Sequence, residues 1–285
     1  MIPMGSLPER ILAMSDLLIH SMSEFSSLIL EAFEVAQVRN IAEIGAEFGG
    51  MSSVLADYCG RVGGQFATID PAPKQEFIDW VAQHPHVTHL AAPSLEVMGD
   101  LEQVDAWVID GDHNYYTVLR ELRLADSVSQ RDGRPLLAFM HDVGWPWARR
   151  DSYYAPDRIP AEHRQLFSFD AGVTLGYAGS LPGRGFRSHG AYACALQAGG
   201  PGNGVLTAVE DFIAEVERDG TRQMCFANVP AVFGLGVLFD ASASWGDPLA
   251  QLLGPYHDNE LIRKLEINRL RNYLQVIDLQ DQRAG

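Results

Sequence analysis

The sequence predicts an α/β fold in which helices cover both faces of a mostly parallel sheet. Between residues 38 and 142, short apolar runs alternate with segments whose apolar residues recur at helical spacing. This alternation is typical of repeated strand–helix units and of a parallel sheet. The apolar runs end at glycine or carboxylate residues, namely Gly45, Asp70, Asp110 and Asp142. Because the carboxyl ends of parallel strands meet at one edge of a sheet, these four residues are expected to surround one ligand site.

The expected elements follow in order along the chain. Residues 7–38 are expected to be helical, with a second helix beginning after Ser23. Strands are expected at 38–44, 65–69, 86–91, 104–110 and 135–140. Further helices are expected at 51–60, 73–83, 115–129 and, over a short length, 94–98. The chain therefore divides into an N-terminal helical segment, residues 1–37, and one large domain, residues 38–285.

The alternation stops after Gly144 and resumes near residue 204. The segment between, residues 144–203, is rich in glycine, proline and aromatic residues. A connection this long inside a compact domain is more typical of a lid or substrate-binding insertion than of a plain loop. The alternative is an ordinary excursion that packs on the sheet edge. A helix at 204–218 and strand-like residues 224–239 follow. The last helix, 258–280, has an apolar face that either packs on the domain or forms a homodimer interface.

The composition excludes several kinds of protein. Of the 285 residues, 47% are hydrophobic and 20% are charged, as in an ordinary globular domain. The net charge of −16 disfavours a nucleic-acid partner, since phosphate binding needs a basic face. Three widely spaced cysteines suggest neither a zinc motif nor a disulfide framework, which fits a reducing compartment. We see no signal peptide and no apolar run that would span a membrane, so a cytoplasmic protein is expected.

The region from Ile41 to Ser52 reads as a buried strand, a glycine-rich turn and the beginning of a helix. Such a turn presents backbone N–H groups to a nucleotide-like ligand. Asp70 ends the next strand, 21 residues after Gly49, where an acidic residue commonly bonds ribose hydroxyls. The turn reads Gly45-x-x-x-Gly49-Gly50 and lacks the GxGxxG spacing, which disfavours nicotinamide and flavin dinucleotides.

The segment from Glu43 to Ser52 resembles the E-I-G-x-x-x-G-G-x-S/T motif of one branch of the class I S-adenosylmethionine-dependent methyltransferases. Glu47 stands where the wider class often has the middle glycine of ExGxGxG. Further matches follow in the order of that family, over roughly residues 38–142. They are Ile69-Asp70-Pro71 after the second strand, Asp110-Gly111-Asp112-His113-Asn114-Tyr115 (similar to a D-G-x-H-x-Y block) after the fourth, and Met140-His141-Asp142 after the fifth.

This resemblance implies a Rossmann-like methyltransferase fold with S-adenosylmethionine as the cofactor. The glycine turn would pass below the methionine part, Asp70 would bind the ribose, and Ser94 would lie near the adenine. The full set of cofactor-binding residues that it implies is Glu43, Gly45, Gly49, Ser52, Asp70, Ser94 and Asp110. The branch contains metal-dependent O-methyltransferases of sugars, macrolides and other natural products. A small-molecule acceptor and a role in antibiotic biosynthesis are therefore expected.

His113 is the expected catalytic base, three residues after Asp110, which is expected to take part in catalysis with it. An imidazole is suited to accept a proton from a hydroxyl group because its pKa lies near the working pH. The alternative is that His113 caps or orients the beginning of the helix that follows.

Asp110, His141 and Asp142 are the expected metal ligands, because the fourth and fifth strands are neighbours in the family that the sequence resembles. Relatives use Mg²⁺ at corresponding positions to hold the acceptor's hydroxyls, and they often have an acid in place of His141. Carboxylates favour Mg²⁺ or Mn²⁺, whereas an imidazole admits Zn²⁺ or Fe²⁺. The alternative is a metal-free site in which the two aspartates orient the substrate or bond backbone amides.

Two other groups of residues bear on function. The arginines of the insertion either bind a carboxylate or phosphate of the acceptor or lie in solvent; they are Arg149, Arg150 and Arg158. A group of histidines without accompanying carboxylates is expected at the surface; it comprises His84, His86 and His89. Two other functions stay open at this point, a nucleotide-dependent oxidoreductase and a non-catalytic binding protein of the same fold.

Overall fold

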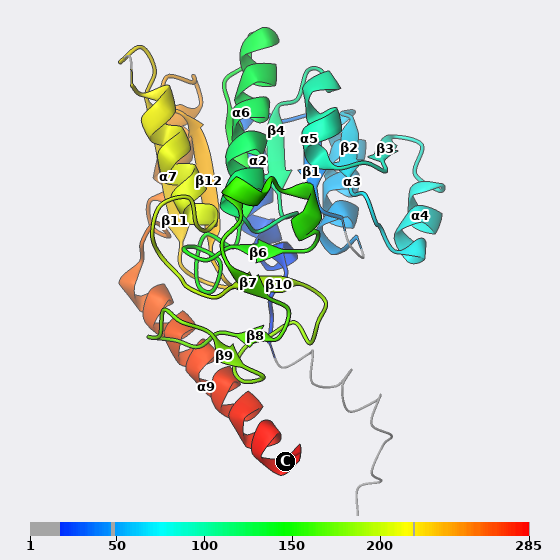
Figure 1. Ribbon diagram of the computed structural model, residues 1–285. Coiled ribbons are helices and arrows are strands. Elements are labelled where there is room, and N and C mark those ends of the chain that lie inside the picture. The colour runs from blue at the N-terminus through cyan, green and yellow to red at the C-terminus, as the bar shows by residue number, and fades with distance from the viewer. Residues whose placement is uncertain (1–17, 47–48, 219, 285) are drawn as a thin grey trace, which may run out of the picture.

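The computed structural model describes residues 18–46, 49–218 and 220–284. A seven-stranded sheet with helices on both faces forms its centre, which confirms the predicted fold class (Figure 1). The helix predicted to begin at Leu7 lies outside the described residues, apart from Leu18.

Five parallel strands form most of the sheet. They are β1 (Ile41–Ile44), β2 (Phe66–Ile69), β3 (Val87–Leu90), β4 (Ala106–Ile109) and β5 (Leu137–His141). Two antiparallel strands complete it, β12 (Leu235–Asp240) beside β5 and β11 (Met224–Val229) at the edge. The order is β11-β12-β5-β4-β1-β2-β3. As predicted, β4 and β5 are neighbours, and their carboxyl ends bring Asp110 and Asp142 to the same edge.

Helices bury apolar side chains against both faces of this sheet. One face packs against α2 (Ser26–Ala36), α3 (Gly50–Val62) and α8 (Gly246–Leu253), and the other against α6 (Tyr115–Arg131) and α7 (Val205–Val216). Alternation along β4 divides the core, since Val108 lies in the first layer and Trp107 and Ile109 lie in the second. The shorter helices are α4 (Gln75–Val81), α5 (Ser94–Val97), η1 (Met22–Phe25) and η2 (Met98–Asp100).

The C-terminal part of the sheet differs in detail from the sequence prediction. The strand-like run 224–239 is two antiparallel strands, β11 and β12, joined by a turn in which Val232, Phe233 and Gly234 have positive φ. Val232 and Phe233 are apolar and buried, and the sequence shows no polar residues where β11 ends and β12 begins. Helix α8 lies where the sequence predicted no element.

The 144–203 insertion contains several short strands. One small sheet consists of β6 (Ser152–Tyr153), β10 (Ala193–Ala195) and β7 (Phe167–Ser168), and another of β8 (Ala171–Gly172) and β9 (Leu181–Pro182). Two 3₁₀ turns, η3 (Pro156–Arg158) and η4 (Ala161–His163), lie between β6 and β7. Figure 1 shows that the insertion lies at the edge of the large sheet where β4 and β5 end, so it is placed to cover the ligand edge.

Asp151 joins the insertion to the large sheet's helices. Its buried carboxylate accepts hydrogen bonds from the backbone N–H groups of Tyr115 at 2.8 Å and Gly204 at 2.7 Å, and from the Tyr153 hydroxyl at 2.7 Å. Tyr115 begins α6 and Gly204 precedes α7, so one carboxylate satisfies N–H groups at two helix N-termini. The neighbouring Ser152 N–H donates to the His113 carbonyl at 2.9 Å, which places the insertion directly against the predicted catalytic residue.

Two of the three predicted acceptor-binding arginines are used by the fold. Arg149 forms a bidentate ion pair with Glu210, in which both nitrogen–oxygen distances are 2.6 Å. Arg150 is buried and donates to main-chain carbonyls of the insertion, including that of Ala195. Arg158 is exposed.

The C-terminal helix α9 (Glu260–Ala284) packs along the insertion (Figure 1). Leu270 is buried against Phe233, and the Tyr273 ring contacts the Phe186 ring with 6.4 Å between centroids. Arg187 of the insertion pairs with Asp281 of α9 at 2.6 Å. Other apolar residues of α9 are exposed, with Leu261 at 66% and Leu265 at 63%. One side of the helix therefore packs on the chain itself, and the homodimer interface stays a prediction. Among the helices of the described residues, none has the length and apolar character needed to span a membrane.

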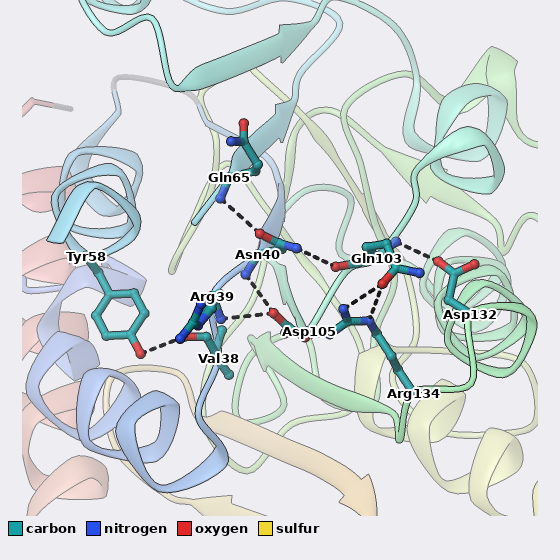
Figure 2. Close-up of polar contacts among 9 residues, drawn as sticks. All are labelled: Val38, Arg39, Asn40, Tyr58, Gln65, Gln103, Asp105, Asp132 and Arg134. Atoms are coloured by element: carbon teal, nitrogen blue, oxygen red, sulfur yellow. Dashed lines mark hydrogen bonds and ion pairs between the residues drawn. The ribbon is translucent and has the colours of Figure 1, made fainter. Parts of the chain in front are cut away.

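A polar network holds the opposite, amino-terminal edge of the sheet together (Figure 2). Asn40 precedes β1; its backbone N–H donates to Asp105 at 2.8 Å, and its side chain contacts the Gln103 carbonyl and the Gln65 N–H at 2.9 and 3.0 Å. Arg134 bonds Asp105 and Gln103 from the segment before β5. These contacts fix the relative positions of β1, β2, β4 and β5 far from the ligand edge.

Candidate active site

The turn after β1 requires glycine at position 45. Gly45 has φ +89°, and a Cβ built on it would lie 2.1 Å from the Asp110 carbonyl oxygen. Gly49 has φ +83°, and its Cβ would lie 2.8 Å from the Phe77 ring. The glycines therefore let the turn lie close to the end of β4 and to α4. Glu47, at the altered motif position, lies outside the described residues.

Asp70 follows β2 and faces the same turn. One carboxylate oxygen accepts the Ala46 N–H at 3.1 Å, and the other accepts the Ala72 N–H at 2.8 Å. These bonds hold the carboxylate beside the glycine turn.

Glu43 lies inside β1 and is 1% exposed. Its Oε2 accepts hydrogen bonds from the Ser52 hydroxyl at 2.5 Å and the Thr68 hydroxyl at 2.9 Å. Burial raises the pKa of Glu43 from its ordinary value of 4.5 to about 8, against the opposing effect of these two bonds. Glu43 and Ser52, which the motif predicts to bind the cofactor, are therefore bonded to each other. Together with Thr68 they link β1, α3 and β2 below the turn.

The raised pKa of Glu43 predicts a pH-dependent stability. The folded state binds this proton more tightly than the unfolded state, so the stabilisation is fully present below pH 4.5 and is lost as pH rises through about 8. At about 1.4 kcal/mol per tenfold change in proton affinity, the loss is at most roughly 5 kcal/mol. We expect Glu43→Gln to lose less free energy of unfolding than the wild type between about pH 5 and 9, measured by urea denaturation. The exposed Glu76→Gln is the matched control; equal losses in all three proteins would contradict the assignment.

Ser94 begins α5 and is bonded to a second buried acid. Its hydroxyl donates to Glu121 Oε1 at 2.5 Å, and both side chains are buried. Burial raises the pKa of Glu121 to about 8. No sequence pattern connects these two positions, because Glu121 has the place of one polar residue in an amphipathic helix. A role of Ser94 near the adenine stays a prediction.

Four side chains converge where β4 and β5 end. His113 Nε2 lies 3.3 Å from Asp110 Oδ1 and 3.1 Å from Asp142 Oδ2. From the other side, His141 Nδ1 lies 3.3 Å from the same Asp110 oxygen and 3.4 Å from the same Asp142 oxygen. The imidazole nitrogens and carboxylate oxygens therefore alternate around a small ring. The structure brings together all four residues that the sequence placed at the catalytic and metal site.

The charges in this ring affect one another. Burial disfavours the imidazolium form, but Asp142 and Asp110 outweigh burial and raise the pKa of His113 to about 9. In the same way, Asp110 and Asp142 raise the pKa of His141 well above its ordinary value despite burial. Burial would raise the pKa of Asp110, but the two histidines lower it below its usual range. Positive charge among these carboxylates is thus strongly favoured.

Asp142 has two features of a ligand residue. It has φ +60°, a left-handed conformation that is uncommon for residues other than glycine and costs free energy. Its Oδ2 faces both imidazoles, whereas its Oδ1 is buried without a hydrogen-bond partner. One ligand atom from each of Asp110, His113 and Asp142 lies within 4.8 Å of the others. Two ligands of one ion, each about 2.1 Å from it, lie roughly 3 Å apart when they are neighbours. The two carboxylates therefore fit a divalent cation, with either His113 or His141 as the nitrogen ligand beside them.

Aromatic residues of the insertion border this ring of side chains. The Tyr154 ring lies edge-on to His113 with 6.0 Å between centroids, and Tyr192 lies 5.6 Å from Tyr154. Tyr154 is 52% exposed. Tyr154 and Tyr192 belong to the 144–203 segment that is predicted to be a lid or substrate-binding insertion, but no sequence pattern distinguishes Tyr192 within it. Together they form an apolar surface beside the imidazole of His113.

The three histidines predicted at the surface are half-buried. Each bonds a main-chain carbonyl; His84, His86 and His89 contact those of Trp80, Ala56 and Asp70 at 2.7, 3.0 and 3.2 Å. They support α4 and β3 and do not join the group at the strand ends.

Residues 42–143 match the model of a family described as a methyltransferase domain. The match spans the region from β1 to β5, which is less than half of the chain. The matched region contains every residue that the sequence placed in the catalytic, cofactor and metal sites, from Glu43 to Asp142. The insertion and α9 lie outside the matched region.

Solved structures resemble the chain more distantly. A methyltransferase of Podospora anserina bound to S-adenosylhomocysteine (SAH) is 12% identical, with a TM-score of 0.43 over 75% of this chain and 76% of that one. An O-methyltransferase of Bacillus cereus in complex with SAH is 16% identical, with a TM-score of 0.44 over 84% of this chain and 93% of that one. The comparison with curated proteins found no match.

Proposed function

We propose that the protein transfers a methyl group from S-adenosylmethionine to a hydroxyl group of a small-molecule acceptor. The observation that carries this proposal is the position of His113. Its Nε2 lies within 3.3 Å of two carboxylates at the sheet edge where the glycine turn and Asp70 also lie. A base beside a cofactor turn is the arrangement that hydroxyl methylation needs.

The residues around the turn fit the proposed cofactor. Gly45 lets the turn lie directly against the Asp110 carbonyl, so the turn and the end of β4 would meet the cofactor together. Asp70 is held beside the turn, where its carboxylate would accept hydrogen bonds from the two ribose hydroxyls. Glu43 is fully buried and would support the turn through Ser52 rather than lie against the cofactor. When bound, the cofactor supplies an electrophilic methyl group, and the chain supplies the position of the acceptor.

His113 would remove the acceptor's proton. When bound at Asp110, Asp142 and His141, a divalent cation would compensate the carboxylates and hold acceptor oxygens. The carboxylates are the cause of the raised pKa of His113, so their compensation would leave the imidazole neutral and able to act as a base.

The surface formed by Tyr154 and Tyr192 would contact the remainder of the acceptor. Tyr154 contacts His113 and is half exposed, so a flat or ring-shaped acceptor could lie on it. This supports a natural-product acceptor, consistent with the expected role in antibiotic biosynthesis. The negative net charge and this uncharged surface argue for a small molecule rather than a nucleic acid.

Isothermal titration with SAH tests the cofactor assignment. We expect binding by the wild type and about tenfold to hundredfold weaker binding by Asp70→Ala, because charge-assisted hydrogen bonds to the ribose would be lost. Asp79→Ala, an exposed aspartate of α4, should bind as the wild type does.

Failure of the wild type to bind SAH would contradict the proposal. Binding of a nicotinamide dinucleotide in its place would favour the oxidoreductase alternative. SAH binding without turnover on any acceptor, in a protein with intact Asp110 and His113, would favour a non-catalytic binding protein.

A further inference from the structure

We propose that His141 provides a nitrogen ligand to the metal at the strand ends, so that the site prefers a transition-metal ion over Mg²⁺. The ions meant are Mn²⁺, Fe²⁺, Co²⁺ and Zn²⁺. This inference rests on the proposed function for the presence of a metal and extends it by naming the class of ion.

A hydrogen bond on the side of the ring away from the two carboxylates fixes the orientation of His141. Its Nε2 lies 2.8 Å from the backbone carbonyl of Val232, which can only accept a hydrogen bond. Nε2 therefore has the proton. The carbonyl comes from the turn between β11 and β12, where positive φ values at Val232 and Phe233 set its direction. The ring is 2% exposed and also packs edge-on against Phe25 with 6.1 Å between centroids.

The opposite nitrogen, Nδ1, points to the two carboxylates. It lies 3.3 Å from Asp110 Oδ1 and 3.4 Å from Asp142 Oδ2, so without a metal it can hold a second proton that both carboxylates accept. A cation between these three atoms would take the place of that proton and would be coordinated by Nδ1 and the two oxygens. Histidines that bind metals nearly always donate their other ring N–H to a carbonyl, a carboxylate or water. His141 and Val232 have this arrangement.

The ligand set selects among ions. Mg²⁺ prefers oxygen donors and near-octahedral coordination, whereas Mn²⁺, Fe²⁺, Co²⁺ and Zn²⁺ accept imidazole together with carboxylate. Nδ1 of His141 is buried and its ring cannot rotate, so this nitrogen would occupy one coordination position that Mg²⁺ prefers to fill with an oxygen ligand. The site should therefore discriminate against Mg²⁺ more strongly than a site built from carboxylates alone.

His113 is the less suitable of the two histidines as a permanent ligand. It is 13% exposed and its ring borders Tyr154 of the insertion, whereas His141 is enclosed by the domain core. His141 is thus the metal ligand, and His113 stays available to the acceptor.

Pulsed EPR of the full-length protein loaded with Mn²⁺ tests this assignment directly. We expect electron spin-echo modulation from a coordinated imidazole nitrogen, shifted when the histidines are labelled with ¹⁵N. His113→Ala should retain the modulation and His141→Gln should lose it, with His189→Gln, an exposed histidine, as the control. Titration calorimetry should give Mn²⁺ at least tenfold tighter than Mg²⁺ in the wild type and a smaller ratio in His141→Asp.

Absence of nitrogen modulation in Mn²⁺-loaded wild type would overturn the inference without reference to any variant, and so would a failure to bind Mn²⁺. Modulation that persists in His141→Gln, or is lost in His113→Ala, would also overturn it. SAH titration separates this from the proposed function. A protein that binds SAH but shows no imidazole nitrogen on Mn²⁺ contradicts only the metal assignment, and a protein with the nitrogen signal but no SAH binding contradicts only the methyltransferase function.

Discussion

Replacing His113 with alanine is expected to lower turnover by about 10²–10⁴-fold and to leave SAH affinity within about twofold of the wild type. The first number is the usual contribution of a general base. The second follows because Gly45 and Asp70, which are proposed to lie against the methionine part and the ribose, follow β1 and β2, whereas His113 follows β4 and its replacement leaves Asp110 in place. The measurement is SAH formation from S-adenosylmethionine with an acceptor that the wild type methylates, paired with SAH titration of the same preparations.

His163→Ala is the matched control for this experiment. His163 lies in the insertion, is exposed, and contacts Tyr116 rather than the carboxylates, with 4.9 Å between ring centroids. Its replacement should leave turnover within about threefold. Normal turnover by His113→Ala would exclude the role as base and return His113 to the alternative of orienting the beginning of α6.

Replacing Gly45 with alanine is expected to destabilise the protein by roughly 2–5 kcal/mol and to abolish measurable SAH binding. The new Cβ would lie 2.1 Å from the Asp110 carbonyl oxygen, so β1 and β4 would have to separate at the site. Overpacking of this kind costs about 1–3 kcal/mol, and the left-handed conformation adds about 1–2 kcal/mol. Urea denaturation gives the first quantity and calorimetry the second.

Gly63→Ala is the control that measures the cost of the left-handed backbone conformation without a steric clash of the new Cβ. Gly63 ends α3 with φ +68°, and a Cβ there would meet no atom within 4 Å. Only the conformational cost of about 1 kcal/mol should appear, with SAH binding unchanged. If the two variants lose the same stability and both bind SAH, the close approach of β1 and β4 at Gly45 is not needed for the cofactor site.

The convergence of Asp110, His113, His141 and Asp142 follows from the sequence because it depends on regular features. Strand ends can be read from apolar runs that stop at polar residues, and a parallel sheet brings such ends to one edge. The neighbouring positions of β4 and β5 came from the family resemblance, and the strand pairing confirms them. The cofactor roles of Glu43, Ser94 and the other turn residues stay predictions, because they concern a ligand rather than the fold.

Other features of the site depend on contacts that leave no periodic pattern. The Val232 carbonyl that orients His141 lies in a turn hidden within one apolar run. The strands of the insertion have two or three residues, too few for alternation to show. Asp151 looks like one more polar residue of the insertion, and only the meeting of α6, α7 and β6 gives its carboxylate three donors.

A crystal structure of the protein with SAH tests the central claim most directly, because that claim is a placement of the cofactor at the ends of β1, β2 and β4. We predict SAH over the Gly45 turn, with both ribose hydroxyls within hydrogen-bonding distance of Asp70 and the sulfur on the side of Asp110 and His113. SAH bound elsewhere, for example at the opposite edge of the sheet near Asp105 and Arg134, or in the predicted region with its ribose away from Asp70, would contradict the account.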